Sequence, residues 1–124
     1  MFEKYVLVDG SLRRAGNGFS VDLRIPYYRG LGLSMVNVPE LTVDGEPVDL
    51  SQARFSVHGN VYALTDLPDV DDDRWGFREP ATLTVPDRPV PPGEHELSVV
   101  VSLRISYLPV PSATRATKTL TLIE

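Results

Sequence analysis

Apolar residues that recur at every second position are the feature that most limits what this chain can fold into. In the longest such stretch they occupy alternate positions from Leu97 to Tyr107, and Val100 is the one apolar residue out of phase. Residues Phe19 to Ile25 alternate just as strictly. A period of two buries one face of a strand, whereas an amphipathic helix needs a period near 3.6. The pattern therefore predicts strands that each cover one side of a core.

Shorter apolar runs repeat this pattern and end in residues that favour turns. Asp44-Gly45 tolerates the positive φ angles of a tight hairpin, and the following Pro47 predicts an edge strand because it cannot donate to a ladder. Residues 54–62 are interpreted as one strand in which Gly59 marks a bulge. Two further strands are predicted, at residues 81–85 and 117–123.

Six or more short strands separated by proline and glycine turns predict an all-β fold. No window of eleven or more residues carries a helical stripe. We expect a two-sheet antiparallel β-sandwich rather than a closed barrel, because a long central strand and proline-blocked edges suit open sheets. Residues 1–124 are expected to form a single domain, since this length is common for one.

Composition excludes several classes of function. The absence of cysteine excludes disulfides, thiolate metal sites and a cysteine nucleophile. The net charge is −5 and the arginines are scattered, so we expect no nucleic-acid partner, because phosphate binding needs a basic face. No apolar run approaches the roughly 20 residues that span a bilayer, and the first residues do not read as a secretory signal. We expect a cytoplasmic protein that does not enter the membrane.

Candidate catalytic and metal-binding residues are few. The acidic run Asp69 to Asp73 has the composition of a calcium loop, but Arg74 and Pro80 occupy the positions where an EF-hand needs glycine and glutamate. We interpret the run as an acidic surface loop. The two histidines, His58 and His95, have no second histidine at ligand spacing and are interpreted as ordinary strand residues.

Nucleophile and phosphate motifs are also missing. The chain contains neither a G-x-S-x-G elbow nor a glycine-rich loop that opens a helix. Two of the seventeen acidic residues could still meet in space, although their spacing favours no pair. The sequence therefore predicts no catalytic residue, no metal ligand and no cofactor in this chain.

Two segments combine arginine with aromatic residues, which are enriched at interface hot spots. Residues 25–36 place two tyrosines and an arginine directly after a strand, and residues 74–78 hold the only tryptophan between two arginines. For one residue alone, capping the core is an equally good interpretation; for both segments together we favour a contact surface. The predicted partner interface or site mouth consists of Tyr27, Tyr28, Arg29 and Trp75, with Met35 and Phe77 behind them.

These residues also carry a resemblance to a known family. In order along nearly the whole chain, the sequence resembles the small β subunit of bacterial C-glycoside deglycosidases. The runs that carry the resemblance are Ile-Pro-Tyr-Tyr-Arg-Gly at 25–30, Leu-Ser-Met-Val at 33–36, Val-Asp-Gly-Glu at 43–46, Arg-Trp-Gly-Phe at 74–77, Gly-Glu-His at 93–95 and Ile-Ser-Tyr at 105–107. No single run is specific; the set in order is moderately so.

The resemblance implies a β-sandwich-like subunit that pairs with a larger α subunit, a TIM barrel of the sugar isomerase type. That partner is implied to hold a divalent metal, for which manganese is expected, and to supply the base. The implied substrate is a 3-oxo-C-glycoside, from which loss of the C2 proton drives β-elimination of the aglycone carbon at C1. This chain would then be an accessory subunit of a carbon–carbon lyase, inactive alone. Flavonoid C-glucosides are the expected substrate class.

Two other functions compete with this interpretation. A non-catalytic carbohydrate-binding module could present Trp75 with Tyr27 or Tyr28 as an aromatic platform for sugars. A stand-alone enzyme could use a metal held by the acidic run at residues 69–73. Calorimetry against simple sugars separates the first from a lyase subunit, and metal analysis of the purified chain separates the second.

Overall fold

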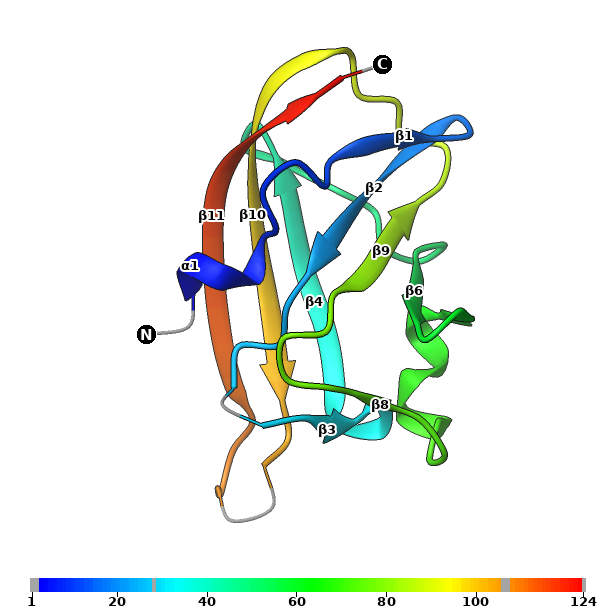
Figure 1. Cartoon of the computed structure of the whole chain (residues 1–124), viewed down its shortest axis with the longest axis vertical. Helices are drawn as coiled ribbons and strands as arrows, with labels where there is room; N and C mark the ends of the chain where they lie inside the picture. The colour runs from blue at the N-terminus through cyan, green and yellow to red at the C-terminus, as the bar shows by residue number, and fades with distance from the viewer. Residues whose placement is uncertain (1–2, 28, 106–107, 124) are drawn as a thin grey trace.

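The computed structural model describes residues 3–27, 29–105 and 108–123, and its regular structure is almost entirely β-strand (Figure 1). All strand pairs are antiparallel, as the alternating pattern predicts. Three sheets are present among the described residues. No helix in this part of the chain is long and apolar enough to cross a membrane.

The first main sheet has the spatial order β11-β10-β4-β5. Its members are β4 (Val36–Val43), β5 (Glu46–Pro47), β10 (Gly93–Leu103) and β11 (Ser112–Leu122). Every second residue of β10 from Leu97 to Leu103 is buried, because one face of this interior strand covers the core. The register against β4 shifts between Val100 and Ser102, beside the valine that is out of phase. The edge position predicted from Pro47 is confirmed.

The second main sheet has the order β1-β2-β9-β6-β7. Its members are β1 (Arg13–Ala15), β2 (Gly18–Leu23), β6 (Arg54–Val57), β7 (Asn60–Ala63) and β9 (Ala81–Val85). Figure 1 shows β2 and β9 lying in front of β4, at an angle to it. Phe19, Phe55 and Leu83 from this sheet join Leu97 and Leu103 from the first in one buried cluster. The predicted all-β sandwich is therefore confirmed.

Residues 54–62 correct one sequence interpretation, because they form a hairpin and not a single strand. His58 and Gly59 have φ angles of +52° and +79° and make a two-residue turn between β6 and β7. Asp44 and Gly45, at +52° and +83°, make the same kind of turn between β4 and β5. Two successive positive φ angles match the twist of paired strands. Gly59 is thus a turn residue and not a bulge.

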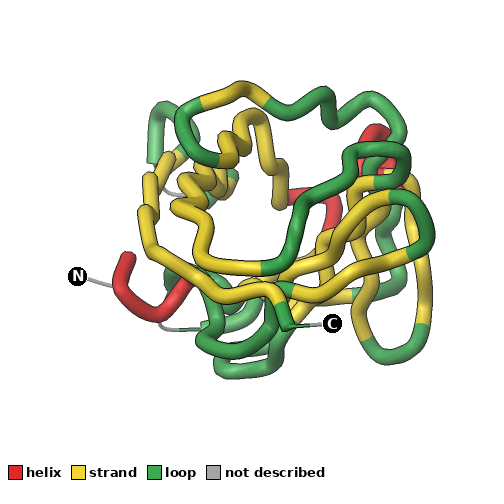
Figure 2. Tube along the Cα trace, turned by 90° about the horizontal axis from the view of Figure 1, so that it is seen from above, coloured by secondary structure: helices red, strands yellow, loops and turns green. Residues whose placement is uncertain are grey.

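The N-terminal segment connects the edges of the two main sheets. After α1 (Glu3–Val6), Leu7 forms a bridge with Leu23 of β2. On the other side, the ammonium of Lys118 on β11 lies 2.9 Å from a carboxylate oxygen of Asp9. Figure 2 shows α1 lying outside the layer of strands. This segment therefore covers one flank of the sandwich.

A third, two-stranded sheet closes the lower end of the molecule in Figure 1. It pairs β3 (Leu31–Gly32) with β8 (Arg74–Trp75). Two short 3-10 helices lie nearby: η1 (Leu33–Met35) follows β3 directly, and η2 (Leu64–Asp69) packs against η1. We call β3, η1, β8 and the turn at residues 76–79 the end cap.

Candidate functional site

The end cap joins the two arginine-and-aromatic segments that the sequence singles out. Leu31 pairs with Trp75, and Gly32 pairs with Arg74. The amide of Leu33 donates a hydrogen bond to the carbonyl oxygen of Asp73 at 3.1 Å. Two segments about forty residues apart in the sequence therefore form one surface at one end of the sandwich.

Trp75 belongs to the core, which corrects its predicted place on a contact surface. Its side chain is fully buried. The indole packs edge-on against Phe55, with ring centroids 5.2 Å apart, and its Nε1 donates to the carbonyl oxygen of Glu79 at 2.9 Å. Because neighbouring residues of a strand point to opposite sides, Arg74 faces solvent when Trp75 faces the core. The indole is thus unavailable as a sugar-binding platform.

The other predicted interface residues divide by exposure. Tyr27 is buried, so it is also part of the core, while Arg29 is exposed. Met35 and Phe77, predicted to lie behind the surface, are instead among the exposed large apolar side chains. Tyr28 lies outside the described residues. Contact of this set with a partner stays a prediction, and its exposed members are Arg29, Met35 and Phe77.

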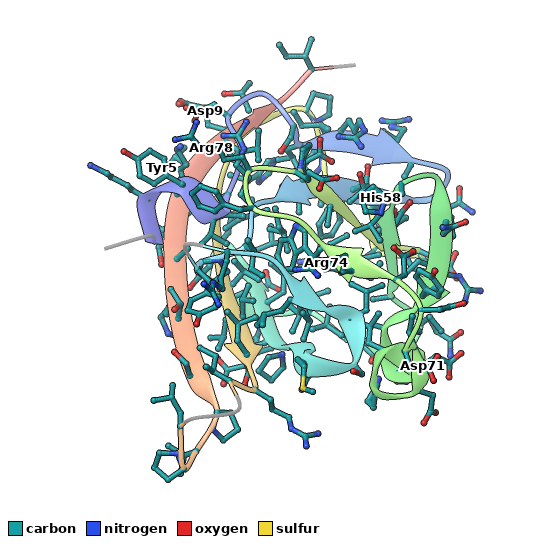
Figure 3. All side chains as sticks on the ribbon, turned by 60° about the horizontal axis from the view of Figure 1, so that its bottom comes forward. Tyr5, Asp9, His58, Asp71, Arg74 and Arg78 are labelled. Carbon is teal, nitrogen blue, oxygen red and sulfur yellow. The ribbon has the colours of Figure 1, made fainter. Side chains whose placement is uncertain are left out.

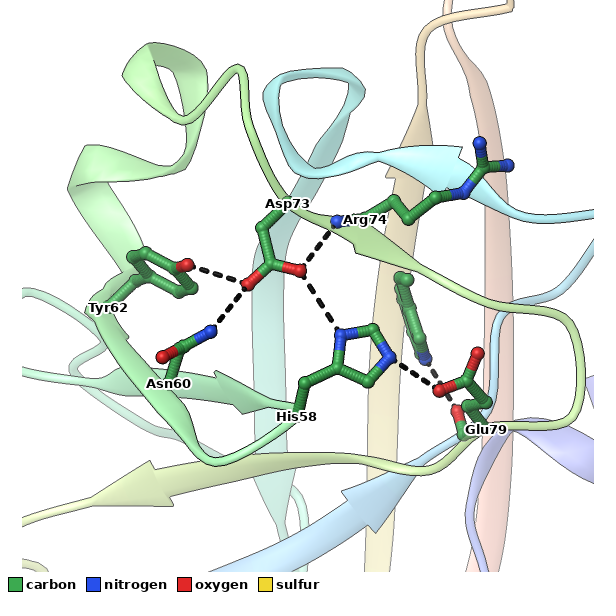
Figure 4. A network of polar contacts seen from close by, with 7 residues as sticks. His58, Asn60, Tyr62, Asp73, Arg74 and Glu79 are labelled. Carbon is green, nitrogen blue, oxygen red and sulfur yellow. Dashed lines mark hydrogen bonds and ion pairs between the residues drawn. The ribbon is translucent and has the colours of Figure 1, made fainter.

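Asp73 is the centre of a polar network beside the end cap (Figure 4). Its carboxylate accepts hydrogen bonds from the Tyr62 hydroxyl at 2.6 Å, the Asn60 amide at 3.2 Å and the Arg74 backbone N–H at 2.8 Å. The Tyr62 bond, with smaller contributions from its other partners, holds the pKa of Asp73 well below its usual range. The same bond raises the pKa of Tyr62 to about 12.

His58 extends this network to the other side of the cap. Its Nδ1 lies 3.1 Å from Asp73 Oδ1, and its Nε2 lies 2.5 Å from Glu79 Oε2. Both partners are carboxylates, which can only accept when ionised, so both ring nitrogens donate from the protonated imidazole. The bond to Asp73, followed by that to Glu79, raises the pKa of His58. The turn of the β6–β7 hairpin is thereby tied to the residue before β8 and to the turn after it.

The chemistry open to this network is limited. Both nitrogens of His58 already have acceptors, so in this arrangement the ring offers no free lone pair to a substrate or metal. Within residues 3–27, 29–105 and 108–123, no three histidine or carboxylate side chains are placed to hold a metal ion. The divalent metal implied by the resemblance therefore finds no fitting ligand set in the described part of this chain. The network positions the cap.

Sequence reasoning did not find this network. The run at residues 69–73 is predicted to be a solvated acidic loop, and Asp71 and Asp72 are indeed exposed. Asp73 differs because Tyr62 and Asn60, two positions apart on β7, point to the same side and reach its carboxylate. The spacing of Asn60 and Tyr62 was visible in the sequence, but their partner was not.

His95 lies near the start of β10, at the end of this strand that is away from the end cap. Its side chain is buried, with Nδ1 2.6 Å from Asp44 Oδ2 and Nε2 2.7 Å from the carbonyl oxygen of Pro91. The hydrogen bond to Asp44 raises the pKa of His95, and in return lowers that of Asp44. It is therefore a paired, buried residue rather than an ordinary strand histidine.

Exposed large apolar side chains gather in two places. Met35, Leu108 and Val110 surround a hollow of about 370 Å³ next to the end cap. Tyr5 and Phe77 lie on a second hollow, between α1 and the turn after β8. Grouped apolar exposure of this kind marks contact sites more often than scattered single residues do.

Comparison with known proteins gives consistent matches. A family model described as C-glycoside deglycosidase beta subunit matches residues 2–107. A 3'-dehydrocarminate deglycosidase beta subunit from Microbacterium sp is 34% identical over 110 residues, 89% of this chain and 83% of that protein. C-glycoside deglycosidase beta subunits from Arthrobacter globiformis and Eubacterium cellulosolvens are 29% and 28% identical, covering 82% and 86% of this chain and 79% and 78% of those proteins.

Proposed function

Because this chain belongs to the C-glycoside deglycosidase beta subunit family, we propose that it acts with a larger, metal-dependent TIM-barrel α subunit that cleaves 3-oxo-C-glycosides. The Microbacterium relative is named for 3'-dehydrocarminate, a dehydrogenated compound, and this name supports an oxidised sugar as the substrate. A cytoplasmic complex acting on flavonoid C-glucosides fits the same proposal.

The proposed reaction is an elimination. A ketone at C3 of the sugar acidifies the C2 proton, and a base within hydrogen-bond reach removes it. The electron pair left on C2 forms the C1–C2 double bond, and the C1–carbon bond to the aglycone breaks. The aglycone carbon leaves with that electron pair and takes up a proton. We assign the base and the divalent metal, for which manganese is expected, to the α subunit.

In this proposal the present chain is an accessory subunit without a catalytic residue. Two observations support it: the family match, and the hydrogen bonding of His58, which is the one exposed histidine. Its two ring nitrogens are both held by carboxylates. The exposed apolar group at Met35, Leu108 and Val110 suits a surface covered by another polypeptide.

Reconstitution tests the proposal. The chain and the α subunit are purified separately and mixed, and cleavage of a 3-oxo-C-glycoside is followed by release of the aglycone. We expect turnover from the mixture and none from this chain alone. Turnover by the α subunit alone at the rate of the mixture would show that this chain is dispensable, and turnover by this chain alone would show that it carries its own active site.

The carbohydrate-binding alternative loses its main support from the structure. The predicted platform needed an exposed Trp75, and this side chain is fully buried. Calorimetry with simple sugars remains a direct check, and we expect no heat of binding from the free chain.

A further inference from the structure

The flank beside α1 carries a hollow that the proposed reaction does not use. Its volume is about 490 Å³ and its lining residues are Tyr5, Arg24, Ile25, Phe77 and Arg78. We call it the aromatic hollow. α1 supplies the first of these residues, the segment after β2 the next two, and the turn after β8 the last two. Figure 3 shows Tyr5 and Arg78 close together on this flank, with Asp9 nearby.

Both aromatic side chains of the hollow are exposed. Tyr5 keeps 53% and Phe77 keeps 41% of its surface open. They are neighbours across one hollow although they lie seventy-two positions apart in the sequence. Tyrosine and arginine are enriched among residues that dominate binding at protein interfaces. Their grouping therefore indicates a site that another molecule covers.

The charge of the hollow is positive, in contrast to the net charge of −5 of the chain. The Lys4 ammonium lies 5.2 Å from the centre of the Tyr5 ring, and the Arg78 guanidinium 5.3 Å from that of Phe77. Arg24 lines the hollow as well, and its buried Nε has no hydrogen-bond acceptor among the described residues. None of the residues lining the hollow is acidic. A ligand that complements this charge must bring anionic groups, which in a polypeptide are the carboxylates of aspartate and glutamate.

The hollow continues past Tyr5 and Arg24, which also line a second hollow of about 550 Å³. Each of the two has the size of a small-molecule site. The two hollows share two lining residues and together make a groove larger than one small ligand, and the second hollow adds the Lys118–Asp9 ion pair to its lining. An extended segment of polypeptide fits this shape better than a single compact molecule.

We propose that this groove receives a segment of the α subunit in which acidic side chains flank an apolar one. The apolar side chain enters between Tyr5 and Phe77, and the carboxylates pair with Lys4, Arg24 and Arg78. This inference rests on the proposed function, because it needs a second subunit. It adds to that proposal a specific binding surface on the flank of the sandwich and the chemistry of the segment that occupies it.

Cross-linking gives the sharpest test, because the chain has only two lysines, Lys4 and Lys118. A water-soluble carbodiimide joins a lysine amine to a carboxylate that lies next to it. In the assembled complex we expect an amide between Lys4 and an acidic residue of the α subunit, identified by mass spectrometry. Lys4→Arg keeps the positive charge but removes the amine, so this variant should assemble normally and lose that cross-link.

Substitutions in the hollow test its contribution to affinity. Arg78→Glu and Phe77→Ala should each weaken binding of the purified α subunit by about tenfold or more, as expected for hot-spot residues. Arg54→Glu is the matched control, because this arginine is exposed on β6 and lies outside the groove. The affinity of this variant for the α subunit should stay within about twofold of the wild-type affinity. Raising the salt concentration should weaken the wild-type complex more than the Arg78→Glu complex.

The outcomes separate this inference from the proposed function. If the two subunits do not associate, both fail. If they associate and turn over substrate, while Lys4 forms no cross-link and both hollow variants bind like the wild type, the groove proposal alone is overturned. The remaining alternative is that the hollow binds a small aromatic acid and not a polypeptide. Titration of the free chain with 4-hydroxybenzoate tests it. Binding that Arg78→Glu abolishes, with subunit affinity unchanged, would overturn the proposal in favour of a small-molecule site.

Discussion

Two hairpin turns at different places in the sandwich share a backbone but use their side chains in opposite ways. The Asp44 turn (Asp44–Gly45) and the His58 turn (His58–Gly59) both have φ angles near +52° followed by about +80°. In the first, the turn supplies the carboxylate and a strand supplies the histidine, His95. In the second, the turn supplies the histidine, and the carboxylates come from Asp73, directly before β8, and from Glu79 of the end cap.

The difference lies in what each pair connects. Asp44 follows β4, and β4 is the hydrogen-bonded neighbour of β10, which carries His95. That pair therefore reinforces contacts that the sheet already makes. His58 connects the second main sheet to the segment around β8, which belongs to a different sheet. The same turn geometry therefore serves two different pairings: one repeats contacts that the sheet already makes, and the other holds separate parts of the fold together.

The largest expected effect concerns the core beneath the end cap. Trp75→Ala should lower the free energy of unfolding by about 3–5 kcal/mol, because it removes a fully buried indole that packs on Phe55. Phe77→Ala, two residues away but exposed, should change it by less than about 0.5 kcal/mol. Denaturant unfolding of both variants checks this. A small cost for Trp75→Ala would mean that the cap is attached by its polar network and not by its core.

The next effect tests whether the two turns are equivalent. Gly45→Ala and Gly59→Ala should each cost about 1–2 kcal/mol, because both glycines have positive φ angles. An added Cβ meets no atom within 4 Å at either position, so sterics should not separate the two. Equal losses in denaturant unfolding would support a shared backbone cost. A much larger loss at one turn would contradict the equivalence.

A third prediction concerns pH. Both histidines have folded-state pKa values raised above the ordinary 6.5. Their stabilisation is therefore fully present below about pH 6.5 and is lost as the pH rises through the raised values. The free energy of unfolding should fall over this interval in the wild type. His58→Gln and His95→Gln should each flatten the fall, and the double variant should flatten it most. An unchanged slope in either single variant would contradict the corresponding pairing.

Hydrogen exchange should show the smaller, local consequences of each pair. The Leu33 amide reports on the end cap through its bond to Asp73, and the Glu96 amide reports on the Asp44 turn through its bond to the Asp44 carboxylate. His58→Gln should speed exchange at Leu33 several-fold and leave Glu96 unchanged. His95→Gln should do the reverse. Equal acceleration at both amides in either variant would mean that the two regions open together.

The smallest effect supplies a baseline away from both turns. Arg115 on β11 and Glu40 on β4 form an ion pair of 2.7 Å, but both side chains are more than half exposed. Such pairs contribute little, so Arg115→Ala should change the free energy of unfolding by less than about 1 kcal/mol. A loss comparable to that of Gly45→Ala would show that this sheet surface is more constrained than its exposure indicates.

Local patterns predicted much of the sandwich, and the reasons are visible in particular elements. The alternation from Leu97 to Leu103 identified the buried face of β10, because side-chain direction in a strand depends only on sequence position. Asp-Gly identified the β4–β5 turn, whereas His-Gly at 58–59 was missed because histidine is a less usual residue at a positive φ. The glycine at 59 did indicate a turn, but His-Gly is a weaker hairpin signal than Asp-Gly.

The candidate site was predicted only in part. The sequence singled out the segments around Tyr27 and Trp75, and the structure joins them through β3 and β8. It could not say which aromatic side chain faces inward, and the structure buries Trp75 and exposes Phe77. Exposure depends on which sheet the segment packs against, which is information that a two-residue strand does not carry.

By itself, the sequence determined the class of fold, the central strand, the edge at Pro47 and the resemblance to a family of deglycosidase subunits. The tertiary structure alone decided that Asp73 meets His58 and Tyr62, and that Tyr5 and Phe77 line one groove with Arg24. The physical reason is how far apart in the sequence the residues that determine each feature lie. Strand faces and turns follow from neighbours one or two positions away, while a network or groove depends on which distant segments the packed core brings together.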